Sequence, residues 1–112
     1  MALIAPTVMS YSTAALPSFT AASASDTFQG PGTEGQYFVV YRNTNAATRT
    51  ITVVVPGNNN YGQANPDPQY TLAATTGELW IPIHPIWQDS TGVVTITTSA
   101  QTNVTVAYMK IQ

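Results

Sequence analysis

Polar and apolar residues alternate along short segments of this chain, and the alternation is clearest between residues 49 and 55. There, Ile51 and Val53 fall on one face of an extended chain, and Thr50 and Thr52 fall on the other. Alternation with a period of two residues is typical of a strand that buries one face against a core. This segment is therefore predicted to be a β-strand.

The same alternation recurs in the second half of the chain. It predicts strands at residues 93–99 and 104–111, and shorter ones at 70–72 and 77–83. Because proline cannot donate a ladder hydrogen bond, Pro82 places the strand at 77–83 on the edge of a sheet. No segment repeats its apolar residues at helical spacing, so we expect no helix longer than two turns.

Residues 37–41 differ from these segments, because Tyr-Phe-Val-Val-Tyr is apolar at every position. A strand that is apolar on both faces lies at the centre of a sheet or meets a partner with its outer face. A short polar turn at 43–47 joins it to the strand at 49–55, and residues 100–103 join the last two strands. These short connections predict two β-hairpins.

Short strands with regular turn signals predict an all-β domain, a small antiparallel β-sandwich or barrel, at residues 26–112. Residues 1–25 carry no charge, are rich in Ala, Ser, Thr and Pro, and lack helical periodicity. They predict an extended segment, which we call the N-terminal arm. The polar residues 58–69, with three successive asparagines, predict a long loop of a length that is often functional.

Large apolar side chains are spaced along the N-terminal arm, and an isolated arm would leave them in water. We therefore expect the arm to lie on a partner protein or a neighbouring copy, together with the outer face of residues 37–41. The expected contact residues are Leu3, Ile4, Val8, Met9, Tyr11, Leu16, Phe19, Tyr37 and Tyr41.

Charged residues make up only 7% of the 112 residues, against about 25% in typical domains. The net charge is −2, and the three basic residues are too few to neutralise a run of phosphates. We therefore expect no nucleic-acid partner. A neutral polar surface can pack against another protein with little desolvation of charge, so it favours permanent protein contacts.

The residues that carry catalytic and metal chemistry are scarce. There is no cysteine and a single histidine, His84, and the five acidic residues are scattered over turns and strand ends. No pair is spaced for acid–base catalysis, and calcium needs several oxygen ligands together. We expect no enzyme, no metal site and no cofactor. No apolar run is long enough to span a membrane, and no basic region marks a signal peptide, so we expect synthesis in the cytoplasm.

Two tryptophans, Trp80 and Trp87, lie seven residues apart around two prolines. The simpler interpretation is that both close the core, although exposed aromatic rings can also stack on sugar rings. Exposure separates the two hypotheses. Two buried indoles favour a structural protein, whereas two exposed and coplanar indoles favour a carbohydrate-binding module.

The order of motifs along the chain resembles that of a known family. The motifs are Asp-Thr-Phe at 26–28, Phe-Val-Val-Tyr-Arg-Asn at 38–43, the strand and Pro-Gly at 50–57, Ile-Pro at 81–82, Trp87 with Asp89, and the Val/Thr strands at 92–97 and 104–107. Together they resemble small virion proteins of tailed bacteriophages that act as capsid decoration (cement) proteins. The resemblance covers most of the chain after residue 18, and the loop at 58–69 is longer than in compact versions.

The resemblance implies a capsid decoration protein that binds the outer surface of the shell and stabilises it, with the major capsid protein as its partner. It brings no catalytic residues. With the neutral surface, it leads us to expect a homo-oligomer, a trimer in preference, on the virion and with no membrane partner. The alternative is a virion-surface carbohydrate-binding or host-attachment module, in a head fibre or tail, that uses Trp80 and Trp87.

Overall fold

The computed structural model describes residues 3–4, 6–9, 19–30, 37–58 and 60–111, and strands dominate this part of the chain. A single turn of 3-10 helix, η1 (Pro85–Trp87), is the helical element of these residues. The strands are β1 (Leu3–Ile4), β2 (Thr7–Met9), β3 (Thr20–Ala21), β4 (Ser25–Gln29), β5 (Tyr37–Asn43), β6 (Arg49–Val54), β7 (Gln69–Leu72), β8 (Gly77–Pro82), β9 (Val93–Thr98) and β10 (Val104–Ile111).

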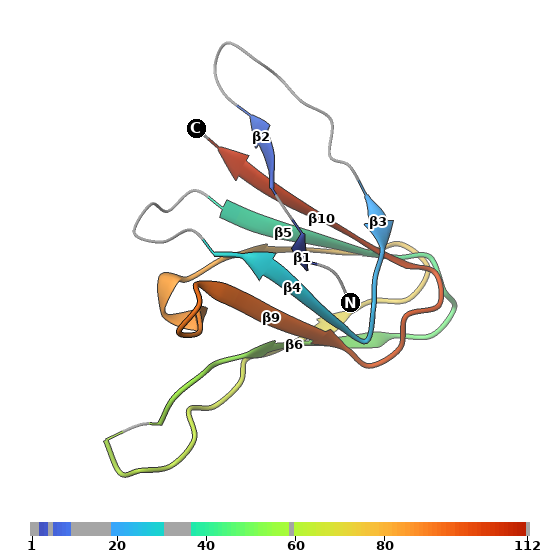
Figure 1. The fold of residues 1–112 in the computed structure, drawn as a ribbon. Helices are drawn as coiled ribbons and strands as arrows, with labels where there is room; N and C mark the ends of the chain where they lie inside the picture. Colours follow the sequence, from blue (N-terminus) through green and yellow to red (C-terminus); the bar gives the residue numbers. More distant parts are fainter. Residues whose placement is uncertain (1–2, 5, 10–18, 31–36, 59, 112) are drawn as a thin grey trace.

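The strands form two sheets that pack face to face, as Figure 1 shows. Sheet A has the order β1-β4-β9-β6-β7. Sheet B has the order β2-β10-β5-β8, and β3 also pairs with β10. The chain is therefore an all-β sandwich rather than a closed barrel. Within it, β5 lies at the centre of sheet B and β8 at an edge, as the sequence predicted for both.

Both predicted hairpins are wrong, because each short connection crosses between the sheets. β5 lies in sheet B and β6 in sheet A, while β9 lies in sheet A and β10 in sheet B. In the first crossing, the Asn43 amide donates to the carbonyl of Ala47 at 2.9 Å and accepts from the backbone N–H of Asn45 at 2.9 Å. These local bonds stabilise a turn that leads out of the sheet instead of doubling back within it.

The pairings among β4 to β10 are antiparallel, as the sequence predicted for the β domain, and the N-terminal arm adds the parallel pairings that make both sheets mixed. β1 pairs in parallel with β4 in sheet A, and β2 pairs in parallel with β10 in sheet B. β1 and β2, from the start of the N-terminal arm, are thus strands at the edges of the two sheets (Figure 1). These short pairings carry no periodic signal of their own, because two or three residues are too few to show alternation.

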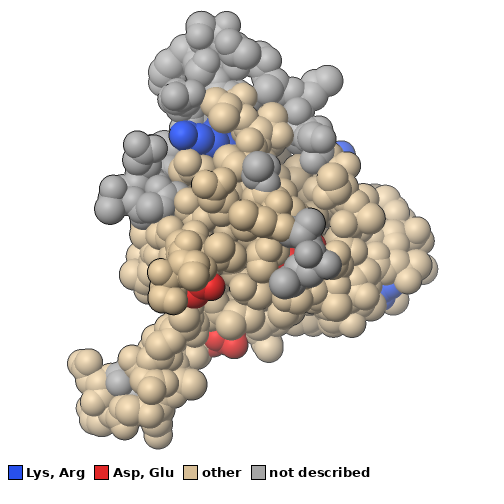
Figure 2. All heavy atoms as spheres, in the orientation of Figure 1, with Lys and Arg blue, Asp and Glu red and all other residues tan. Residues whose placement is uncertain are grey.

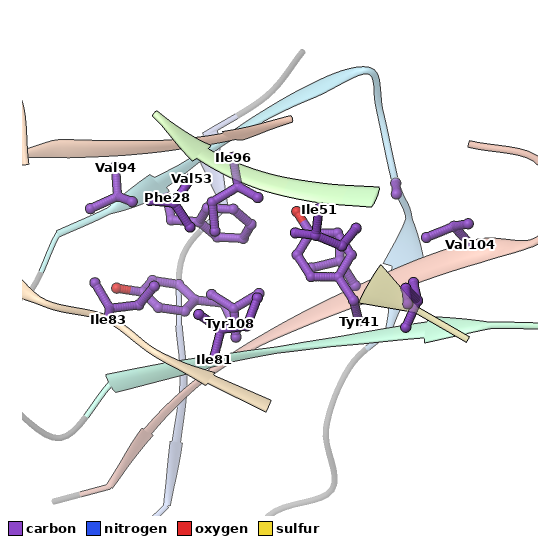
Figure 3. Packing of buried hydrophobic residues seen from close by; sticks show 14 residues of the cluster. Phe28, Tyr41, Ile51, Val53, Ile81, Ile83, Val94, Ile96, Val104 and Tyr108 are labelled. Atoms are coloured by element: carbon purple, nitrogen blue, oxygen red, sulfur yellow. The ribbon is translucent and has the colours of Figure 1, made fainter. Parts of the chain in front are cut away.

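The core lies between the sheets and takes its side chains from the inward positions of the strands, as Figure 3 shows. Phe28 from sheet A meets Tyr108 from sheet B edge to face, with ring centroids 5.2 Å apart. The Tyr108 hydroxyl donates to the carbonyl of Gln29 at 2.5 Å, so the two sheets also share a hydrogen bond. Apolar burial and this hydrogen bond together hold the layers in register.

The connection between β6 and β7 projects away from the sandwich as a long loop (Figure 1). At its base, the carboxylate of Asp67 accepts from the backbone N–H of Val55 at 2.8 Å. Further out, the Asn65 side chain donates to the carbonyl of Pro56 at 3.0 Å. Near the tip, Tyr61 is 90% exposed. The loop predicted from the polar run is therefore present, and its base is held by side-chain hydrogen bonds.

Candidate functional site

An aromatic and charged array lies on the outer face of sheet B. The side chains of Val39 and Ile81 point into the core, so their neighbours along β5 and β8 point outward. Cross-strand pairing then places Arg42 of β5 opposite Glu78 of β8. Strand register alone thus gathers residues that are distant in the sequence.

The central member of the array is Trp80, whose side chain is 59% exposed. Its ring stacks on Phe38, with centroids 5.0 Å apart and an interplanar angle of 13°. Its indole N–H donates to Oε2 of Glu78 at 3.0 Å. An aromatic neighbour and a hydrogen bond therefore both restrain the orientation of the indole.

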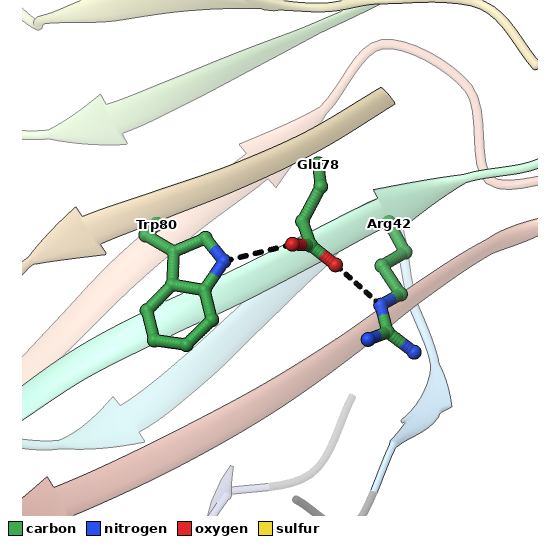
Figure 4. Close-up of polar contacts among 3 residues, drawn as sticks. All are labelled: Arg42, Glu78 and Trp80. Carbon is green, nitrogen blue, oxygen red and sulfur yellow. Dashed lines mark hydrogen bonds and ion pairs between the residues drawn. The ribbon is translucent and has the colours of Figure 1, made fainter. Parts of the chain in front are cut away.

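Glu78 joins Trp80 to Arg42, as the dashed contacts of Figure 4 show. The Arg42 Nε donates to Oε1 of Glu78 at 2.6 Å, and the two side chains are 52% and 38% exposed. The guanidinium lies 4.2 Å from the ring centre of Phe19. Because an exposed ion pair contributes little to stability, its main effect here is to orient the three side chains.

The electrostatics of the array favour an ionised carboxylate. The indole N–H of Trp80 lowers the pKa of Glu78 below its usual range, and the hydrogen bond and charge of Arg42 act in the same direction. Above this depressed pKa, Glu78 can accept hydrogen bonds through the parts of its oxygens that face solvent. The array can therefore bind a ligand with an apolar face and polar edges.

The described residues contain no group of three or more His, Cys, Asp or Glu side chains that could hold a metal ion. His84 has a local structural role, because its Nδ1 accepts a hydrogen bond from the backbone N–H of Ile86 at 3.2 Å and so caps η1. Among the described residues, no helix has the length and hydrophobicity that a membrane span requires.

The expected contact residues of the N-terminal arm lie in different environments. Leu3 and Val8, on β1 and β2, are 55% and 45% exposed. Ile4 packs partly against the core, and Met9 pairs with Ile111 along β2 and β10. Two further residues, Tyr11 and Leu16, lie outside the described residues.

The remaining expected contacts are Phe19 of the N-terminal arm and the two tyrosines of β5, Tyr37 and Tyr41. Phe19 contributes to the array through Arg42, and Tyr37 packs partly against the core beside Tyr108. Tyr41 is fully buried, which corrects its assignment to a contact surface. Burial raises the pKa of its hydroxyl, as does the charge of Asp26. Tyr41 therefore belongs to the core while the domain is folded.

The two tryptophans lie on separate surfaces and do not form one platform. Whereas Trp80 is exposed on sheet B, Trp87 is half-buried, packs against the core and lies beside His84. Trp87 also lines an open pocket of about 310 Å³ at the base of the projecting loop. The pocket is lined by Val55, Asn65, Pro66, Pro68, Ile86 and Trp87.

Sequence reasoning named Trp80 and Phe19 but missed Phe38, Arg42 and Glu78 as their partners. The signal that could have found them is the register of β5 against β8, which places an arginine opposite a glutamate. In comparisons with known proteins, no family model, no curated protein and no solved structure matches the chain.

Proposed function

We propose that the chain is a bacteriophage capsid decoration protein that binds the outer surface of the major capsid shell and stabilises it. The observation that carries the proposal is the exposure of Leu3 and Val8 on strands held in the fold. Large apolar side chains that are presented at a sheet edge gain free energy when a partner protein covers them.

The attachment of these strands supports the same proposal. β1 pairs with sheet A and β2 with sheet B, so the backbone under both side chains is already ordered. A preorganised contact surface loses less conformational entropy on binding than a disordered arm would. The arm thus pairs partly with the domain itself, and the exposed side chains of β1 and β2 remain available to the shell.

The distribution of charge also fits a protein that binds a protein shell. The face of the molecule in Figure 2 carries scattered charged groups among neutral residues, and the whole chain has three basic and five acidic residues. Neutral side chains can be buried in an interface without the desolvation cost of charges. Binding that favours the assembled shell then stabilises it by mass action, with a trimer as the proposed oligomer.

The double variant Leu3→Ser/Val8→Ser tests this proposal. About half of each aliphatic side chain is exposed and would be covered by the shell. Removing both therefore lowers the binding free energy by about 2 kcal/mol, which corresponds to an affinity about 30-fold weaker. The measurement is the occupancy of the protein on mature shells, prepared without it, of the phage that encodes the chain. Fluorescently labelled protein is titrated onto the shells, and the bound fraction is counted after sedimentation.

Tyr61→Ser is the matched control, because it also removes a large exposed side chain but lies on the projecting loop. It is expected to bind as the unaltered protein does. Equal binding by the double variant and the unaltered chain would reject the edge formed by β1 and β2 as the attachment surface. Failure of the unaltered chain to bind the shells would reject the decoration function itself.

A further inference from the structure

We propose that Trp80, Glu78 and Arg42 form a binding site for a neutral pyranose sugar on the outer face of sheet B. The site is separate from the edge formed by β1 and β2 that is proposed to bind the shell. Its test is therefore independent of the decoration function. Figure 4 shows its three members together: the indole of Trp80 and the guanidinium of Arg42 each donate a hydrogen bond to the carboxylate of Glu78.

The aromatic part of the site suits the apolar face of a sugar ring. Trp80 is 59% exposed although it stacks on Phe38. An indole with this much exposed apolar surface, held in one orientation, offers a flat surface at little further entropic cost. A pyranose with equatorial hydroxyls presents C–H groups on its face, and these groups can cover the ring.

The polar part of the site suits the hydroxyls at the edge of such a ring. Glu78 supplies acceptor oxygens and Arg42 supplies donors, and both side chains are partly open to solvent. The carboxylate lies beside the indole, because its Oε2 accepts the indole N–H at 3.0 Å. A sugar stacked on Trp80 therefore has hydrogen-bonding groups of both kinds at its edge.

Charge decides between neutral and anionic sugars. The single cation of the array is already paired with Glu78 at 2.6 Å, and the whole chain has a net charge of −2. A uronic acid would meet this carboxylate and would lack an unpaired cation within the array. The ligand class is therefore a neutral hexopyranose, such as a unit of a β-linked glucan.

The test is a titration of the full-length chain with cellotetraose, followed by the indole N–H signals of its two tryptophans in ¹⁵N NMR spectra. The Trp80 signal is expected to shift with a dissociation constant of about 1 mM, typical of a single shallow site worth roughly 4 kcal/mol. The Trp87 signal, from the other surface, is expected to stay in place. Tetragalacturonate, matched in length but anionic, is expected to leave both signals unchanged.

Two variants complete the experiment. Trp80→Ala is expected to bind cellotetraose at least tenfold more weakly, measured by calorimetry, and to remain folded because the residue is exposed. Tyr61→Ala, which removes an exposed aromatic residue elsewhere, is expected to bind as the unaltered chain does. The proposal is overturned if cellotetraose moves neither indole signal, if it moves that of Trp87 alone, or if tetragalacturonate binds more tightly. Unchanged affinity in Trp80→Ala would also overturn it.

Discussion

Gly77→Ala is expected to lower the free energy of unfolding by about 4 kcal/mol, because it combines overpacking with the loss of a buried hydrogen bond. A Cβ atom at position 77 would lie 1.9 Å from the carbonyl oxygen of Ala73 and 2.7 Å from its carbonyl carbon. Backbone atoms cannot move aside as the end of a flexible side chain can. The same carbonyl also accepts from the buried Asn43 amide at 3.1 Å, so its displacement breaks that bond too.

Urea denaturation followed by circular dichroism measures this change. The control is Thr75→Gly in the same turn, where the threonine has a φ of 67°. Because a β-branched residue is strained in that region, glycine is expected to stabilise the protein by about 1 kcal/mol. If Gly77→Ala lowers the free energy of unfolding by less than about 1 kcal/mol, position 77 does not lie as close to the Ala73 carbonyl as described.

Phe28→Ala is expected to cost about 4 kcal/mol, as truncations of a fully buried phenylalanine do. Phe28 is completely buried and packs edge to face against Tyr108 of the opposite sheet. The truncation removes apolar contacts and leaves a cavity between the sheets at the point where they share the hydrogen bond from Tyr108 to Gln29. Calorimetric unfolding gives the change in stability.

Phe28→Leu is the informative companion, because it keeps most of the apolar volume and is expected to cost about 1.5 kcal/mol. Tyr61→Ala, at an exposed site, should change stability by less than about 0.5 kcal/mol. If both substitutions at position 28 cost as little as Tyr61→Ala, Phe28 does not join the sheets as described.

The alternation of residues predicted which faces of the strands are buried but not which strands pair. Ile51, Val53 and Ile96 occupy inward positions of the core, as their period of two implies. The same pattern is satisfied by a neighbour in the same sheet or in the opposite sheet. Only the turn chemistry of residues such as Asn43 separates a hairpin from a crossing, and that depends on contacts formed in the folded chain.

The candidate site depended on register in the same way. Trp80 stood out in the sequence, but its partners became visible only when β5 and β8 were aligned with Arg42 opposite Glu78. Exposure was equally hidden, because Trp80 and Trp87 have similar sequence surroundings and lie on different surfaces. Apolar residues can serve a core, a ligand or a partner, and the sequence pattern does not distinguish these roles.

The proposed decoration function is tested by an electron-microscopy reconstruction of the virion that the proposal assigns to the chain. The expected result is density for this sandwich on the outside of the shell, with the edge formed by β1 and β2 against the major capsid protein. Leu3 and Val8 should lie in that contact, and the projecting loop with Tyr61 should point elsewhere. A shell without this fold would reject the decoration function, and a shell that holds it with β1 and β2 facing solvent would reject this edge as the attachment surface.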